Sequence, residues 1–171
     1  MIKIRKEKAE DYEAVGEIND KAFGQPEEGR IVDKIREACE GIISLVAVED
    51  EKVVGHIFFS PAFINFNGKE IKGMGLAPMA VHPDCQNKGI GSLLIKEGIK
   101  KVKETGCSFI IVLGHEKYYP RFGFETASMY GIKPQWDGVP DEAFMIMILD
   151  HEAMAGVSGI ATYRKEFGEA M

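Results

Sequence analysis

The chain has 171 residues, of which 45% are hydrophobic and 28% are charged, and this size and balance are typical of a globular protein with a buried core. Its formal net charge of −6 argues against nonspecific binding to nucleic acid, because a phosphate backbone attracts basic surfaces. The 3 cysteines form no C-x-x-C pair, so we expect neither a disulfide framework nor a zinc site.

No apolar run approaches the length needed to cross a bilayer, and the amino-terminal stretch Met1–Lys6 is charged where a signal peptide would be apolar. We therefore expect a cytoplasmic protein that binds neither membranes nor nucleic acid. No linker, repeat or low-complexity segment divides the sequence, so residues 1–171 are predicted to form a single domain.

The amino-terminal part predicts one strand and two helices. Ile2–Arg5 alternates apolar and charged residues, as an edge or first strand does. Helical spacing follows from Glu10, and its apolar face consists of Tyr12, Val15, Ile18 and Phe23. Gly24-Gln25-Pro26 breaks this pattern. A second helix is then expected over Glu27–Cys39, ended by Gly41.

Two hairpins are expected next. Ile43–Glu49 and Val53–Ser60 are apolar runs rich in β-branched residues, and they are joined by a turn at Asp50-Glu51-Lys52. His56 lies within the second run, where a partly buried, hydrogen-bonded histidine is favoured over a catalytic one. Asn67-Gly68 is typical of a type I′ turn, so the residues on its two sides form another hairpin or a lengthened strand.

The centre of the chain predicts a strand, a tight loop and a helix. Leu76–Val81 is an apolar run that stops at His82-Pro83, because proline cannot donate to a ladder and disfavours helical geometry in the residue before it. Ser92–Val102 then has apolar residues at helical spacing and lysines on its other face. Pro78 within the strand indicates a bulge or an edge position.

The loop Gln86–Gly91 has the features of a phosphate-binding site. Amides at the start of a helix have no partner within it, and they point outward beside the positive end of the helix dipole. Gly89 and Gly91 let the main chain approach an anion, and Gln86 and Lys88 can add side-chain donors. The same glycines also suit a plain helix-entry turn, so both interpretations stay open. The sequence matches neither a Walker A loop nor a dinucleotide fingerprint.

A second buried strand follows the helix. Cys107–Gly114 is a continuous apolar run of the kind found in strands covered on both faces. Residues 76–114 therefore predict a βαβ unit with parallel strands and a right-handed crossover. A ligand should bind at the carboxyl ends of these strands, where the helix begins and Gly114 ends the second strand.

The remainder predicts two strands and a loop. Glu142–Leu149 is expected to pair antiparallel with a strand that starts near Phe124. The loop Tyr130–Val139 contains the only tryptophan, Trp136, which serves as a structural anchor or as the cap of a pocket. Gly156–Tyr163 is expected to contain a short extra strand.

Two motifs, in this order, resemble those of the GNAT superfamily of acyl-CoA-dependent N-acetyltransferases. The strand that ends in Ala80-Val81-His82-Pro83, followed by Q-x-x-G-x-G at 86–91 and an amphipathic helix, is similar to motif A of that family. Tyr118–Phe124 resembles its Tyr-x-x-x-Gly-Phe signature. The resemblance is nearest to the subgroup of predicted N-acetyltransferases called YhbS-like, and it is weak before residue 40 and after residue 150.

This resemblance implies an α/β (α+β) fold with a single mixed central β-sheet, in which a splayed pair of parallel strands is flanked by helices. It implies one acetyltransferase domain over residues 1–171, with 151–171 as a C-terminal extension. The co-substrate would be acetyl-CoA, with no metal. The residues that would bind it are Met79, Ala80 and Val81 for the pantetheine and Gln86, Asn87, Lys88, Gly89, Ile90, Gly91 and Ser92 for the pyrophosphate.

The resemblance also implies catalytic residues. Tyr119 matches the tyrosine that protonates the departing thiolate, because it lies four positions before Gly123. Glu116, which follows the end of the second parallel strand, is a candidate for the general base. The base stays open, since the family often uses ordered water; the side chains to consider are Glu116, His115, His82 and Glu70.

The expected activity is direct transfer of an acetyl group from acetyl-CoA to a primary amine of a small molecule or peptide. Two rival interpretations remain. The first is a regulatory module that binds coenzyme A without catalysis, and the second is a transferase that uses a longer acyl donor or a protein N-terminus. Exposed strand edges in this family also suggest a homodimer.

Overall fold

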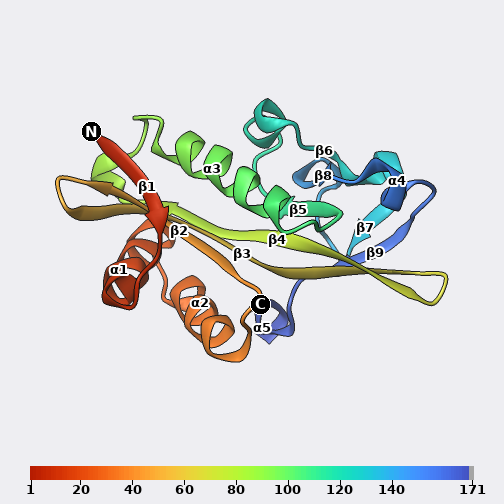
Figure 1. Ribbon diagram of the computed structural model, residues 1–171, viewed down its shortest axis with the longest axis horizontal. Helices are drawn as coiled ribbons and strands as arrows, with labels where there is room; N and C mark the ends of the chain where they lie inside the picture. Colours follow the sequence, from red (N-terminus) through yellow and green to blue (C-terminus); the bar gives the residue numbers. More distant parts are fainter. Residues whose placement is uncertain (170–171) are drawn as a thin grey trace. The chain divides into compact units, whose positions relative to one another are not determined.

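The computed structural model describes residues 1–169, and the fold divides into two compact units that are built from separate stretches of chain (Figure 1). Unit 1 comprises Met1–Phe59, Ala77–Lys101 and the chain from Lys165 onward. Unit 2 comprises Ser60–Leu76 and Val102–Arg164. Two long strands, β3 (Lys52–Phe66) and β4 (Lys69–Val81), have residues in both units.

The strands of residues 1–169 join one mixed sheet in the order β1-β2-β3-β4-β5-β8-β6, with β9 paired to β3 and β7. Beside β3 and β4, the strands are β1 (Ile2–Lys6), β2 (Ile43–Glu49), β5 (Phe109–Leu113), β6 (Glu125–Thr126), β7 (Ile132–Pro134), β8 (Phe144–Ile148) and β9 (Gly159–Thr162). The β4–β5 and β7–β9 pairs are parallel, whereas β1–β2, β2–β3, β5–β8, β6–β8 and β3–β9 are antiparallel. This confirms the predicted mixed α/β class with a parallel pair at its centre.

In unit 1 the helices cover both faces of the sheet (Figure 1). The helices are α1 (Tyr12–Phe23), α2 (Glu27–Ala38), α3 (Ile90–Glu104) and α5 (Lys165–Glu169), with α4 (His151–Met154) in unit 2. A Cβ atom added at Gly98 of α3 would lie 2.5 Å from the ring of Phe59, and one added at Gly55 of β3 would lie 3.1 Å from Ile90 and Leu94. The glycines therefore let α3 approach the strand closely.

Helix α1 buries a narrower face than its apolar spacing predicts. Val15, Ile18 and Asn19 are buried. Tyr12 and Phe23 are 41% and 42% exposed, so the expectation that they share the buried face was wrong. Both are terminal residues of the helix, and the Arg36 guanidinium lies 3.9 Å from the centre of the Tyr12 ring and covers it from α2.

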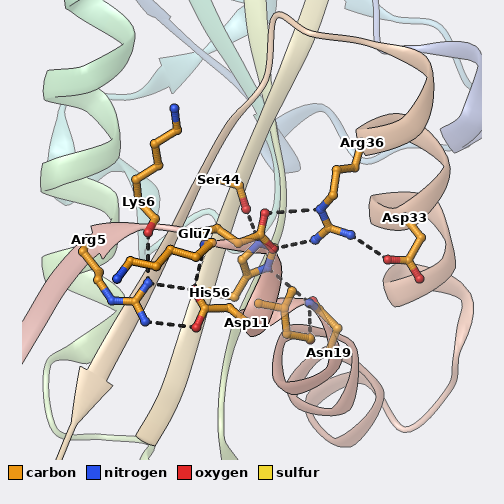
Figure 2. Close-up of polar contacts among 11 residues, drawn as sticks. Arg5, Lys6, Glu7, Asp11, Asn19, Asp33, Arg36, Ser44 and His56 are labelled. Carbon is orange, nitrogen blue, oxygen red and sulfur yellow. Dashed lines mark hydrogen bonds and ion pairs between the residues drawn. The ribbon is translucent and has the colours of Figure 1, made fainter. Parts of the chain in front are cut away.

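A buried polar cluster joins α1 to the sheet (Figure 2). The Asn19 amide nitrogen donates to the Val15 carbonyl at 3.0 Å and lies 3.2 Å from His56 Nδ1, which therefore accepts. His56 Nε2 then carries the hydrogen and donates to Ser44 Oγ at 2.9 Å. Desolvation, together with the charge of Arg36, lowers the pKa of His56 to about 3. His56 is thus neutral, hydrogen-bonded and fully buried, where the sequence predicted partial burial.

Two ion pairs link β1 and the residue after it to other parts of unit 1 (Figure 2). The Arg36 guanidinium donates to both carboxylate oxygens of Glu7, and both side chains are at most 10% exposed. A further bond reaches Asp33 at 2.6 Å. Arg5 likewise makes a two-pronged pair with Asp11, at 2.7 and 3.0 Å. Arg36 and Glu7 fix α2 against the end of β1, because a carboxylate and a guanidinium match geometrically in this arrangement.

Unit 2 is built around β5, whose residues Phe109–Val112 are buried. The Phe109 ring lies against the α-carbon of Gly73, where a Cβ would approach it to 2.5 Å. Strand β8 pairs with β5 from Phe109–Ile148 to Leu113–Phe144. The predicted carboxyl-terminal strand is present as β9, and the type I′ turn at Asn67-Gly68 joins the lengthened strands β3 and β4.

No helix in the described residues 1–169 is both long enough and apolar enough to span a membrane.

Candidate active site

The chain leaves β4 through a tight, hydrogen-bonded turn in unit 1. The His82 amide donates to the Val54 carbonyl at 2.8 Å, which keeps the end of β4 beside β3. Pro83–Cys85 then forms one turn of 3₁₀ helix, in which His82 Nδ1 accepts from the Asp84 amide at 3.1 Å. These bonds place Gln86 at the start of the exposed loop that leads into α3.

The loop uses two left-handed residues to turn into the helix. Asn87 has φ 66° and Gly89 has φ 81°, a region that asparagine and glycine occupy more readily than other residues. A Cβ added at Gly89 would meet no atom within 4 Å. The outer side of the loop is therefore open at Gly89, as an anion cradle requires.

The amides at the start of α3 are available to a ligand. Leu93 is the first residue of the helix whose amide bonds backward, to the Gly89 carbonyl at 3.2 Å. Among residues 1–169, no hydrogen bond joins the amides of Lys88–Ser92 to another residue. Unpartnered amides at the amino end of a 15-residue helix favour an anion through direct donation and through the helix dipole.

The other predicted binding residues surround this loop. Met79, Ala80 and Val81 form the carboxyl end of β4, where Ala80 is buried and the other two are half-buried. Gln86 Nε2 donates to the Val81 carbonyl at 3.1 Å, so this side chain braces the loop against the strand. Lys88 is exposed and has no partner among the residues described. Pro78 follows a cis peptide bond within β4.

Tyr119 lies in unit 2, at the first residue of a 3₁₀ helix that runs to Phe122. Its amide donates to the His115 carbonyl at 3.3 Å. Its ring lies on the α-carbon of Gly114, so closely that an added Cβ would approach ring atom Cε2 to 2.4 Å. Edge-to-face contacts with Tyr118 and Phe124, at 5.3 and 5.8 Å between ring centroids, hold the ring from two further sides.

Burial determines the protonation of the Tyr119 phenol. Desolvation, with a smaller contribution from the Tyr118 hydroxyl, raises the pKa of Tyr119 to about 12. The hydroxyl keeps its proton at physiological pH, as a phenol with an ordinary pKa near 10 also does. It can donate a hydrogen bond or a proton, but it cannot act as a base.

The candidates for the base are dispersed. His115 and Glu116 are exposed and lie in the turn between β5 and Tyr119. His82 belongs to the turn after β4 in unit 1, and Glu70 lies at the opposite end of β4 from Val81. No hydrogen bond with another residue in 1–169 orients the side chains of His115, Glu116 or Glu70.

One residue near Tyr119 was not singled out from the sequence. Tyr163 follows β9 and is buried in unit 2, where its hydroxyl donates to the Ile111 carbonyl of β5 at 3.4 Å. Gly114, on whose α-carbon the Tyr119 ring lies, is three residues further along the chain. No motif marks this tyrosine. Only the pairing of β9 with β7 and β3 brings it to this place.

Comparison with known proteins identifies a matching family and a relative that aligns with nearly the whole chain. The acetyltransferase (GNAT) domain family matches residues 3–127. The chain is 31% identical over 165 residues to the uncharacterized N-acetyltransferase YhbS of Escherichia coli strain K12, an alignment that covers 96% of this chain and 97% of YhbS.

Two crystal structures resemble the whole fold. The structure of YhbS from Escherichia coli in complex with CoA has a TM-score of 0.89 and 30% identity, covering 98% of this chain and 92% of that one. A GNAT family acetyltransferase from Brucella melitensis in complex with acetyl-CoA has a TM-score of 0.79 and 33% identity, covering 98% of both chains.

Proposed function

The chain belongs to the GNAT family of N-acetyltransferases, and from this membership we propose that it transfers the acetyl group of acetyl-CoA to a primary amine of a small molecule or peptide. The observation that carries the proposal is the run of unpartnered amides Lys88–Ser92 beside the open α-carbon of Gly89. The complexes of the two similar proteins with CoA and acetyl-CoA support it. We place the activity in the cytoplasm, where acetyl-CoA is available.

The loop and the end of β4 hold the donor in this proposal. The amides from Asn87 to Ser92 surround the pyrophosphate, and Lys88 adds a positive charge. Gln86 keeps the loop against Val81. The main-chain groups of Met79, Ala80 and Val81 pair with the pantetheine arm, which positions the thioester for attack.

The transfer proceeds by direct attack. The amine first loses a proton, and its neutral nitrogen adds to the thioester carbonyl carbon, forming the C–N bond. A main-chain N–H of β4 stabilises the negative charge that develops on the carbonyl oxygen. The C–S bond then breaks, the positively charged nitrogen of the intermediate gives its second proton to the base, and the thiolate takes the proton of Tyr119, whose phenolate is reprotonated from solvent. The phenol is fully protonated before each turnover, since the pKa of Tyr119 is about 12.

We place Glu116 first among the candidates for the base. Its exposed carboxylate lies three residues before Tyr119, in the turn that follows β5. His115 shares that turn, and an ordered water held by either side chain would serve equally well. To separate these alternatives, each residue is replaced by glutamine and the rate of thiol release is measured as a function of pH. Only loss of the true base is expected to remove the fall in rate that its protonation causes at low pH.

The experiment that tests donor binding is titration calorimetry with acetyl-CoA. Gly89→Glu places a negative side chain where the pyrophosphate should lie. Gly106→Glu is a matched control, because Gly106 is also exposed and left-handed, with φ 78° and open space around its α-carbon, but lies beyond the opposite end of α3. Both variants carry the same added charge and the same backbone strain.

We expect the parent and Gly106→Glu to bind acetyl-CoA with dissociation constants on the order of micromolar, and Gly89→Glu to bind on the order of 100-fold more weakly. Equal binding by all three proteins would show that the loop is not the pyrophosphate site. Absence of binding by the parent would overturn the proposed function. With binding established, release of free thiol against a panel of amines identifies the acceptor class, and longer acyl-CoA donors test the choice of acyl group.

A further inference from the structure

Tyr163 lies in the core of unit 2, on the segment that follows β9. It is 6% exposed. Its amide donates to Gln135 Oε1 at 2.6 Å, and its ring stacks on Trp136 with 5.5 Å between centroids and 24° between planes. The loop that contains the only tryptophan thus holds Tyr163 through both its backbone and its ring. This contact gives Trp136 a structural role.

The ring of Tyr163 lies directly on β4. A Cβ added at Gly75 would approach two atoms of the ring to 2.4 Å. Gly75 does not have the left-handed conformation that calls for glycine, so the ring, not the backbone, requires the missing side chain. Gly75 pairs with Ile111 of β5, and the parallel register ends one pair later, at Leu76–Val112. The ring therefore lies at the carboxyl end of the β4–β5 ladder.

The hydroxyl of Tyr163 bonds to β5 at the same place. It donates to the Ile111 carbonyl at 3.4 Å, and the Leu113 amide makes a further hydrogen bond to it. The next residue after Leu113 is Gly114, on whose α-carbon the Tyr119 ring lies. Burial raises the pKa of Tyr163 above its usual range, so the hydroxyl remains a donor. One side chain therefore contacts both parallel strands, immediately before the residue that supports Tyr119.

We propose that Tyr163 is a positioning residue for the acetyl transfer, holding the carboxyl end of β5 beside Gly75 of β4 and so fixing the place of the Tyr119 phenol. The proposal rests on the proposed function, because Tyr119 is the proton donor there. A tyrosine that only filled space would need no specific partner for its hydroxyl, and phenylalanine would replace it without effect. Here the hydroxyl is engaged by the backbone of the strand that carries the support of Tyr119.

The first test measures the strand end itself and needs no activity. Tyr163→Phe keeps the ring and removes the hydroxyl. Tyr130→Phe is the matched control, because Tyr130 belongs to the same unit and its hydroxyl donates to Glu125 at 2.7 Å on the surface. We expect amide hydrogen exchange of Leu113 and Gly114 to quicken on the order of tenfold in Tyr163→Phe only, as loss of one buried hydrogen bond would cause. Unchanged exchange would overturn the proposal.

The second test measures turnover with the amine that the parent acetylates fastest. We expect Tyr163→Phe to lower kcat on the order of tenfold while leaving KM for acetyl-CoA within about twofold, since the pyrophosphate loop is untouched. Gly75→Ala should lower kcat in the same way, because its methyl group displaces the Tyr163 ring. An unchanged kcat in Tyr163→Phe, with the strand end loosened, would show that the hydroxyl serves stability alone.

The two tests separate the two proposals. If the parent releases no thiol with any amine, the proposed function fails, and the positioning role fails with it, although the exchange result would still establish the strand anchor. If the parent is active and Tyr163→Phe matches it in both measurements, only the positioning role fails. The melting temperature of every variant is measured as well. Where it lies above the assay temperature, simple unfolding is excluded as the cause of a lower rate.

Discussion

Burial shifts the pKa of two side chains, Tyr119 and His56, in opposite directions. A phenol removed from water holds its proton more tightly, so the pKa of Tyr119 rises to about 12. An imidazole removed from water gives up its proton, so His56 is a neutral link between Asn19 and Ser44. The same physical cause raises the pKa of the group that is charged when it loses its proton and lowers the pKa of the group that is charged when it gains one.

Replacement of Tyr119 by phenylalanine should remove the hydroxyl and leave the ring in its contacts with Gly114 and Phe124. We expect kcat to fall on the order of 100-fold, as loss of a general acid does, with the dissociation constant for acetyl-CoA within about twofold of the parent value. Thiol release and calorimetry measure the two quantities. Tyr118→Phe is the control, because its half-buried ring contacts Tyr119 from the adjacent position. Equal losses in both variants, or none in Tyr119→Phe, would contradict the assigned role.

His56 should make stability depend on pH. An unfolded histidine titrates near pH 6.5, whereas burial lowers the pKa of folded His56 to about 3. The unfolded chain therefore binds more protons between these values, and the free energy of unfolding falls as pH drops through 6.5. From pH 7 to pH 5 this one group should cost about 2 kcal/mol.

Urea titrations at the two pH values measure this loss. His56→Gln cannot titrate, so its stability should fall by about 2 kcal/mol less than that of the parent over the same interval. His151→Gln is the control, because His151 is exposed and should leave the slope unchanged. The same pH slope in His56→Gln as in the parent would show that His56 is not the titrating group.

At the scale of elements, close packing of α3 reverses the usual effect of a glycine on the stability of a helix. Glycine within a helix is unfavourable by itself, and Gly16 in α1 is such a case, since an added Cβ would meet nothing within 4 Å. Gly98 in α3 is the opposite case, because an added Cβ would lie 2.5 Å from the Phe59 ring. The identical substitution should therefore have opposite signs in the two helices.

We expect Gly16→Ala to raise the free energy of unfolding by about 0.5–1 kcal/mol and Gly98→Ala to lower it by about 1–3 kcal/mol. Urea titration at neutral pH gives both values, and each variant is the other's control. Stabilisation by both substitutions would mean that α3 can shift from β3 without loss, contrary to the packing described.

Elements with a strong local signal were predictable from sequence. The spacing predicted a helix over Ser92–Val102, and α3 extends from Ile90 to Glu104. Asp50 and Glu51 do adopt the left-handed turn between β2 and β3. The strand expected to start at Phe122–Phe124 begins later, at β6, because Gly123 has φ 105° and ends the 3₁₀ helix first.

Part of the candidate site could be predicted from the sequence, and part could not. The loop after β4 could be predicted because its residues are contiguous and their amides need only the start of a helix. Tyr163 could not, because it carries no motif and the pairings of β9 with β3 and β7 must form before its ring lies on Gly75. Burial of Tyr119 likewise depends on Gly114 and Phe124, and no local pattern states that these pack on one ring.

At the scale of the whole molecule, the chain passes between its two units at four points, which are Phe59/Ser60, Leu76/Ala77, Lys101/Val102 and Arg164/Lys165. Neither unit is a continuous segment. The residues assigned to the loop of unit 1 and to Tyr119 of unit 2 consequently come from alternating parts of the sequence. The match to the acetyltransferase (GNAT) domain family ends at residue 127, so it does not cover the last strands of unit 2 or the residues of α5.

This interleaving bears on synthesis by the ribosome. Helix α5 packs on α2, and Phe167 is buried, so unit 1 lacks part of its core until residues 165–169 have emerged from the exit tunnel. Unit 2 cannot close earlier, since β9 is among the last strands to be translated. The core of neither unit can therefore be completed before residues 159–169 have been made, and a fragment that ends before residue 159 is expected not to fold stably.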